Sequence, residues 1–132
     1  MRVVIPSRKR VEACRHVLGL FPGATVVVRE DEVEAYSGLG AELLAHPTSV
    51  QGIAPLKNWI LDAIPDETVF IVDDDISMLK AMPGRATKSA PIRDPRVIRQ
   101  IIENAEQMAR ALGTGVFGFN QNGGDVRKFR NQ

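Results

Sequence analysis

Short apolar runs alternate with helical patterns along the chain, and this order constrains the fold more than any other feature. Strands are predicted at residues 3–5, 25–28, 42–45, 68–72 and 115–119, and helices at residues 11–21, 31–38, 55–64 and 95–112. The run at 25–28 is β-branched throughout, which is typical of a parallel strand covered on both faces. Alternating strands and helices favour a mostly parallel sheet. The sequence therefore predicts an α/β fold with helices on both faces of the sheet.

The size and charge of the chain suit one globular domain spanning residues 1–132. Apolar residues make up 44% and charged residues 25% of the 132 positions, and the net charge is +1. No global basic field attracts nucleic acid, although local basic clusters can still do so. No apolar run approaches the ~18–20 residues that span a bilayer, and the N-terminus does not resemble a signal peptide. We therefore expect no membrane partner and a cytoplasmic location.

One predicted strand runs directly into three consecutive aspartates, in the stretch "VFIVDDDI" at residues 69–76. Two like charges about 4 Å apart repel by roughly 4 kcal/mol at an effective dielectric of 20. A divalent cation would offset that repulsion. Side chains alternate along an extended backbone, so Asp73 and Asp75 face one side and Asp74 the other. Paired carboxylates suit Mg²⁺ or Mn²⁺; the alternative is that the aspartates cap a helix and face solvent.

Charged and polar residues also follow the other predicted strands, at residues 6–10, 29–31, 46–47 and 120–122. Ligands of open α/β sheets bind outside the carboxyl ends of the strands. Basic groups and carboxylates that meet at one edge favour a site for a metal-bound diphosphate. The glycine-rich phosphate loops of dinucleotide enzymes and P-loop enzymes are absent from the sequence.

These strand ends resemble those of nucleotide-sugar glycosyltransferases of the GT-A (Rossmann-like) fold. Members of that family have a Pro-Ser/Thr loop after the first strand, here "IPSR" at 5–8, and a polar or acidic residue after the second, here among 29–31. They also have a Gly-x-x-x-x-Arg/Lys-Asn run, here "GIAPLKN" at 52–58, and an Asp-x-Asp signature, here at 73–75. The motifs "IPSRKR", "VVVREDEVEAY", "KNWILDA", "VDDDI" and "GVFGFNQN" are most similar to phage-type glycosyltransferases associated with TET-like oxygenases.

The resemblance implies transfer of a sugar from a nucleotide-sugar donor to a hydroxyl, with hydroxymethylated pyrimidine in DNA as the favoured acceptor, in a bacterial or phage-infected cytosol. Asp73 would contact the ribose, Asp75 the Mn²⁺ or Mg²⁺ ion, and Glu30 the base. The implied donor-binding residues are Pro6, Ser7, Arg8, Arg29, Glu30, Gly52, Lys57, Asn58, Asp73 and Asp74, and the implied metal ligands are Asp73 and Asp75. Simple surface solvation is the alternative for Arg8 and Lys57.

The later part of the chain is expected to serve the acceptor. A loop of about a dozen residues, 82–93, contains three basic residues, and loops of that length in compact domains are usually functional or mobile. The candidate acceptor residues are Arg85, Lys88, Arg93, Arg127 and Lys128. Asp125 is the candidate catalytic base. Because members of the resembled family continue past the fifth strand, we expect the acceptor part to be incomplete in a chain that ends at Gln132.

Two other functions remain open from the sequence. A sugar-phosphate nucleotidyltransferase shares this sheet architecture, but it normally has a glycine-rich loop after the first strand, where this chain has "IPSRKR". A non-catalytic nucleotide-sugar-binding module is the second alternative. The identity of the sugar and of the nucleotide, the stereochemistry of transfer and the oligomeric state are not predicted.

Overall fold

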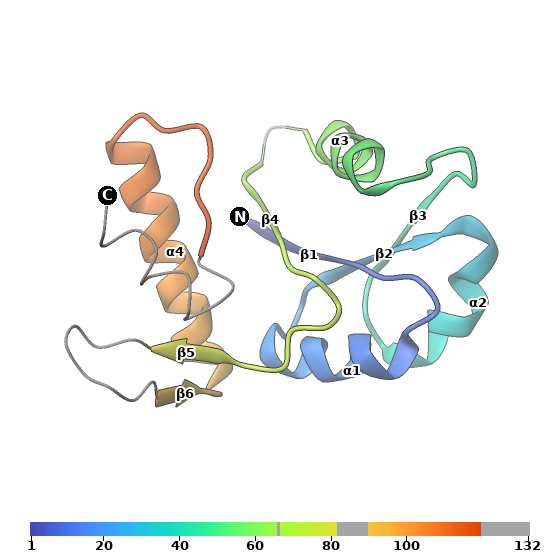
Figure 1. Ribbon diagram of the computed structural model, residues 1–132, viewed down its shortest axis with the longest axis horizontal. Coiled ribbons are helices and arrows are strands. Elements are labelled where there is room, and N and C mark those ends of the chain that lie inside the picture. The colour runs from blue at the N-terminus through green and yellow to red at the C-terminus, as the bar shows by residue number, and fades with distance from the viewer. Residues whose placement is uncertain (66, 82–89, 120–132) are drawn as a thin grey trace, which may run out of the picture.

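The computed structural model, which describes residues 1–65, 67–81 and 90–119, contains a four-stranded parallel sheet (Figure 1). Its strand order is β3-β2-β1-β4. The strands are β1 (Arg2–Pro6), β2 (Thr25–Arg29), β3 (Leu43–His46) and β4 (Val69–Ile71). All three strand pairs are parallel, with Val4 opposite Thr25, Arg2 opposite Val69 and Val26 opposite Leu43. The predicted α/β fold with a mostly parallel sheet is confirmed.

Helices cover both faces of this sheet, as the apolar strands predicted. Val3 and Ile5 of β1 point to one face, where they pack with α1 (Val11–Leu20) and α4 (Pro95–Ala111). The alternate residue Val4 points to the other face and packs with Ile60 of α3 (Ile53–Ala63). Figure 1 shows α3 above the sheet and α1 below it. The period-2 alternation of side chains in β1 therefore divides the core into two layers.

The segment between β2 and β3 is a broken helix. It consists of a 3₁₀ turn at Glu30–Glu32, the short helix α2 (Val33–Tyr36) and a second 3₁₀ turn at Ser37–Leu39, after which Gly40 adopts a φ of +67°. The predicted helix at 31–38 is thus present in three pieces. Its last α-helical residue, Tyr36, is completely buried among the side chains of the core.

The longest helix, α4, begins where the sequence predicted. Asp94 caps it by accepting a hydrogen bond from the backbone N–H of Arg96 at 2.9 Å, and Pro95 occupies the first helical position. Ile98 and Ile102 of its apolar stripe are fully buried. Within residues 1–65, 67–81 and 90–119, no helix is both long and apolar enough to cross a membrane.

The structure corrects two parts of the predicted fold. Residues 90–92 were expected to belong to a loop, but Ala90–Ile92 forms β6, which pairs antiparallel with β5 (Leu79–Ala81). Leu79 and Ile92 face each other in this pair and pack against the main core, which stabilises a strand pair too short to be read from the sequence.

The second correction concerns the fifth strand, predicted at 115–119. These residues adopt no strand conformation. Gly115 and Gly118 interrupt the segment, and glycine weakens a strand because it has no side chain to pack. Instead, Phe117 and Phe119 contact Phe70 of β4, with ring centroids 6.0 and 5.9 Å apart. Aromatic packing replaces the expected backbone pairing.

Candidate donor site at the carboxyl ends of the strands

The chain turns sharply immediately after β4, at residues 73–76, and we call this segment the aspartate turn. The backbone N–H of Ile76 approaches the carbonyl oxygen of Asp73 at 3.5 Å. Asp73 and Asp75 are exposed, whereas Asp74 is only 8% exposed. Two carboxylates face solvent at the edge of the sheet and the middle one points inward, as the sequence separated them, but the separation arises from a turn and not from the expected extended backbone.

Both oxygens of Asp74 have partners inside the protein. Oδ2 accepts a hydrogen bond from the Ser7 hydroxyl at 2.7 Å, and Oδ1 accepts one from Nη1 of Arg10 at 3.2 Å. The same Arg10 nitrogen lies 3.7 Å from Oδ2 of Asp75. A guanidinium between two adjacent carboxylates offsets the repulsion that the three aspartates would otherwise generate. These partners favour a supporting role for Asp74 and Ser7, and direct donor contact by either residue stays a prediction.

A second tether holds the chain just beyond the aspartate turn. Nε2 of His16, on the exposed face of α1, lies 2.9 Å from the carbonyl oxygen of Ser77. A carbonyl oxygen only accepts, so Nε2 carries the hydrogen in this contact. Two residues therefore link this segment to α1 and the loop before it: Arg10 binds Asp74 within the turn, and His16 binds Ser77 just after it.

The loop after β1 contains two further basic residues, Arg8 and Lys9, beside Arg10. Lys9 has a φ of +55°, unusual for a residue other than glycine, and its backbone N–H donates to Oε1 of Glu32 at 2.8 Å. The second oxygen of Glu32 is buried and, among the described residues, forms no hydrogen bond; Arg8 Nε lies 3.9 Å from it. The Arg8 side chain remains 63% exposed. Glu32 therefore fixes the loop while Arg8 faces solvent.

The end of β2 provides the next polar group along the sheet edge. Arg29 donates two hydrogen bonds of 2.6 Å to the two oxygens of Asp31. This pairing raises the pKa of Arg29 and lowers the pKa of Asp31. The exposed Glu30 accepts a hydrogen bond from the backbone N–H of Thr48 at 3.1 Å, which ties the loop after β3 to the end of β2. Arg29 is engaged by a neighbouring side chain, whereas the second carboxylate oxygen of Glu30 forms no hydrogen bond with any residue that the structure describes.

The end of β3 and the start of α3 complete this edge. His46 lies opposite Arg29 in the strand pairing, is buried, and packs edge-on against Trp59 with ring centroids 5.8 Å apart. Gly52 precedes α3 with a φ of +93°, a conformation that strains any residue with a side chain. Lys57 and Asn58 are exposed on α3, and the hydrogen bonds and ion pairs of the described residues do not include them. The predicted contact of these two side chains with a donor therefore stays a prediction.

The sequence of the chain matches one protein family over its whole length. The profile described as TET-Associated Glycosyltransferase covers residues 1–132. The chain belongs to the TET-associated glycosyltransferase family. No curated protein and no solved structure matches it. The family resemblance inferred from the sequence motifs is confirmed, and the protein is a glycosyltransferase.

A divalent metal in this TET-associated glycosyltransferase would have two protein carboxylates to bind at the aspartate turn. Among the described residues, no group of three His, Cys, Asp or Glu side chains is arranged to hold a metal ion. Mg²⁺, and by similar chemistry Mn²⁺, often takes only one or two protein carboxylates and completes its coordination with substrate phosphates and water. The exposed pair Asp73 and Asp75 fits that incomplete donor set. Both residues remain candidate ligands that would share the ion with a bound donor.

Most residues predicted to serve the acceptor fall in segments 82–89 and 120–132 of the sequence. Asp125, Arg85, Lys88, Arg127 and Lys128 lie outside the described residues. Arg93 is described: it is exposed and lies between β6 and the Asp94 cap of α4. The structure therefore describes a single member of the predicted acceptor set in this glycosyltransferase.

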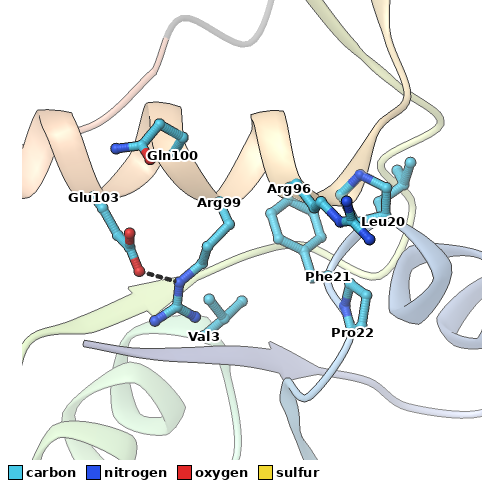
Figure 2. Close-up of a pocket in the computed structure, with 9 residues that line it drawn as sticks. Val3, Leu20, Phe21, Pro22, Arg96, Arg99, Gln100 and Glu103 are labelled. Carbon is cyan, nitrogen blue, oxygen red and sulfur yellow. Dashed lines mark hydrogen bonds and ion pairs between the residues drawn. The ribbon is translucent and has the colours of Figure 1, made fainter.

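The glycosyltransferase also has a pocket that is separate from the aspartate turn. This pocket has a volume of about 320 Å³. Figure 2 shows it between α4 and the end of α1, where Arg99 donates to Glu103 at 2.6 Å. It is lined by Val3, Leu20, Phe21, Pro22, Pro95, Arg96, Arg99, Gln100 and Glu103. None of the residues predicted to bind donor, metal or acceptor lines it. The pocket lies at the end of the sheet opposite to the carboxyl ends of the strands.

Two residues at the aspartate turn were not among the predicted site residues. Arg10 lies within the motif "IPSRKR", which drew attention to Arg8 instead. Tyr36, whose hydroxyl lies 2.8 Å from the Ser7 hydroxyl, ends the motif "VVVREDEVEAY", in which only Arg29 and Glu30 were predicted site residues. The motif itself was the available signal for Arg10. No sequence pattern indicated that the Tyr36 hydroxyl would meet a serine 29 residues away.

Proposed function

We propose that this enzyme transfers a sugar from a metal-bound nucleotide-sugar donor to the hydroxyl of a hydroxymethylated pyrimidine in DNA. The observation that carries the proposal is the pair of exposed carboxylates, Asp73 and Asp75, on either side of the anchored Asp74. They belong to a chain of the TET-associated glycosyltransferase family. The family favours glycosyl transfer over the nucleotidyl transfer that the same architecture also permits.

The roles of the individual residues follow from their chemistry. Asp73 would accept hydrogen bonds from the ribose, and Asp73 and Asp75 would hold Mn²⁺ or Mg²⁺. When bound, the metal would act as a Lewis acid that stabilises the leaving nucleoside diphosphate. The exposed guanidinium of Arg8 would add positive charge near the phosphates. Glu30, with one oxygen on Thr48, would offer the other to a donor base.

The remaining donor residues support the same proposal at the rim of the sheet. Lys57 and Asn58 are exposed on α3 and would reach the donor from the opposite face of the sheet. Gly52 and Pro6 would shape the backbone around it. Asp125 remains the proposed base that removes the acceptor proton. The basic residues proposed to contact DNA phosphates are Arg85, Lys88, Arg93, Arg127 and Lys128.

A thermal-shift screen of nucleoside diphosphates, with and without Mn²⁺, tests the donor half of the proposal. Free ligand at 100 times its dissociation constant stabilises a protein by about 2.7 kcal/mol. We expect one diphosphate to raise the melting temperature in Mn²⁺ but not in chelator. Asp75→Ala should abolish the shift, while Asp62→Ala, which removes an exposed carboxylate on α3, should retain it. Equal shifts in Mn²⁺ and chelator would contradict the metal dependence.

A transfer assay tests the acceptor half. The chain is incubated with nucleotide sugars, Mn²⁺ and either hydroxymethylated or unmodified DNA, and the nucleosides are then analysed by mass spectrometry. Any sugar that the chain transfers should be found on the hydroxymethylated DNA and not on the unmodified DNA. Transfer to a small alcohol or saccharide, with none to modified DNA, would contradict the acceptor assignment. Donor binding with no hydrolysis and no transfer would instead favour the non-catalytic binding module.

A further inference from the structure

Four residues from three separate segments form a closed ring of hydrogen bonds beneath the aspartate turn. The backbone N–H of Arg10 donates to the Tyr36 hydroxyl at 3.1 Å, and that hydroxyl lies 2.8 Å from the Ser7 hydroxyl. Ser7 donates to Asp74 at 2.7 Å. The Arg10 guanidinium then closes the ring on Asp74 at 3.2 Å. The ring joins the loop after β1, the end of α2 and the aspartate turn.

The direction of each hydrogen bond in the ring is determined by its chemistry. An ionised carboxylate only accepts, so the single hydrogen of the Ser7 hydroxyl goes to Asp74. The Tyr36 hydroxyl must therefore donate to Ser7, and its oxygen accepts from the Arg10 N–H. The three bonds point the same way, from Arg10 through Tyr36 and Ser7 to Asp74, and aligned bonds of this kind strengthen one another. Loss of the Tyr36 hydroxyl would remove two of them.

Tyr36 is the member of the ring that is held most firmly, because its side chain is part of the core. It is 0% exposed, while Ser7 and Asp74 are 7% and 8% exposed. Asp73 and Asp75 flank Asp74 in the chain and project into solvent. Whatever holds Asp74 therefore also holds the backbone from which both exposed carboxylates extend.

Arg10 adds a charge to this arrangement. Its Nη1 lies 3.2 Å from a carboxylate oxygen of Asp74 and 3.7 Å from one of Asp75, so one positive charge reduces the repulsion between two neighbouring carboxylates. Its side chain is 57% exposed, and among the described residues only Nη1 of the guanidinium has a protein partner. The rest of the guanidinium faces the solvent beside the aspartate turn.

We propose that Tyr36 and Arg10 are positioning residues of the donor site. They hold Asp74, and through it they orient Asp73 and Asp75 to receive a metal-bound diphosphate. The inference rests on the proposed function, because it needs a diphosphate at the aspartate turn. The Tyr36 hydroxyl would thus affect the affinity for the donor without contacting the donor.

Calorimetry with Mn²⁺ and inorganic pyrophosphate tests this role without choosing a base or a sugar. Tyr36→Phe changes neither charge nor ring volume, and we expect it to weaken binding about five- to tenfold, as the loss of a hydrogen bond to the ring implies. Arg10→Gln should weaken binding at least as much, because the complex of Mn²⁺ with pyrophosphate is anionic. Arg10→Lys should retain affinity within about threefold, since a single nitrogen makes both carboxylate contacts.

Arg15→Gln is the matched control, because Arg15 is likewise an exposed arginine, on α1, but it pairs with Glu12 one turn before it. It should bind as the unaltered chain does. Hydrogen exchange of the Arg10 amide, measured by NMR, checks that Tyr36→Phe has broken the ring. Unchanged pyrophosphate affinity in Tyr36→Phe, with faster exchange at Arg10, would overturn the inference but not the proposed function. If Tyr36→Phe does not fold, unchanged affinity in Arg10→Gln overturns it. No binding by the unaltered chain would contradict the proposed function and the inference together.

Discussion

The Ser7 hydroxyl donates a 2.7 Å hydrogen bond to Asp74 across 67 residues of sequence, and both side chains are buried. This bond joins the end of β1 to the turn that follows β4, two neighbouring strands of the sheet. It divides the three aspartates into one structural carboxylate and two exposed ones.

Asp74→Ala should destabilise the fold much more than Asp75→Ala does. Removing Asp74 leaves the buried Ser7 hydroxyl without its acceptor, which costs about 1–3 kcal/mol of unfolding free energy. Removing the exposed Asp75 should change stability by no more than about 0.5 kcal/mol. Urea denaturation of the two variants measures both values. Equal stability losses would contradict the division of roles between these neighbouring aspartates.

The aromatic contact that docks residues 115–119 onto β4 should be measurable as a coupling energy. Phe70 and Phe117 stack with an interplanar angle of 15°, and such pairs contribute about 0.5–1.5 kcal/mol beyond the area they bury. A double-mutant cycle of Phe70→Leu and Phe117→Leu, read by urea denaturation, should give a coupling in that range. Strictly additive losses would show that the two rings act independently.

Two carboxylates that accept hydrogen bonds, the exposed Asp31 and the partly buried Glu106, should make the chain less stable in acid. Hydrogen bonds from Arg29 lower the pKa of Asp31, and hydrogen bonds from Thr68 and Arg110 lower the pKa of Glu106. A lowered pKa in the folded state means that the stabilisation is complete above the ordinary values of 3.8 and 4.5 and is lost as the pH falls through the folded values. Urea midpoints should therefore fall as the pH drops below the range of those values. Asp31→Asn should reduce this dependence on pH. An unchanged dependence in that variant would show that Asp31 does not contribute to the loss of stability in acid.

Binding of DNA should be weak and strongly dependent on salt. Lys and Arg contacts to phosphates release counterions, so affinity falls as salt rises from about 50 to 200 mM. Replacing the exposed Arg93 by Ala should reduce the salt slope by about 1, if it contacts one phosphate. Fluorescence anisotropy with a hydroxymethylated duplex measures the slope, with Arg15→Ala as a control on another surface. An unchanged slope in Arg93→Ala would exclude that contact.

The sequence predicted those parts of the fold that leave a periodic pattern. The apolar stripe and Asp94-Pro95 start predicted α4, and uniform apolar runs predicted the parallel strands. The alternation along 73–75 predicted that Asp74 would face away from Asp73 and Asp75, but not that Asp74 would be the buried one. The pair β5–β6 was missed because strands of three residues carry too little pattern. The strand predicted at 115–119 was wrong because its apolar residues pack through aromatic faces rather than through the backbone.

The supporting contacts of the candidate site were less accessible to prediction. Arg10 and Asp74 are separated by 64 residues, and their contact depends on how β1 and β4 come together. The position of the Tyr36 hydroxyl depends on a helix broken by two 3₁₀ turns. Motifs indicate which residue types gather at a sheet edge. They do not indicate which of those residues bind one another and which stay exposed to a ligand.

Metal-dependent binding of a nucleoside diphosphate at Asp73 and Asp75 is the central claim, and calorimetric titration tests it most directly. The diphosphate identified by thermal shift is titrated into the unaltered chain and into Asp75→Ala, each in Mn²⁺ and in chelator. We predict that the unaltered chain binds in Mn²⁺ and loses at least about tenfold in affinity in chelator, equivalent to about 1.4 kcal/mol. Asp75→Ala should bind weakly in both conditions. Undiminished binding by the unaltered chain in chelator would contradict the claim.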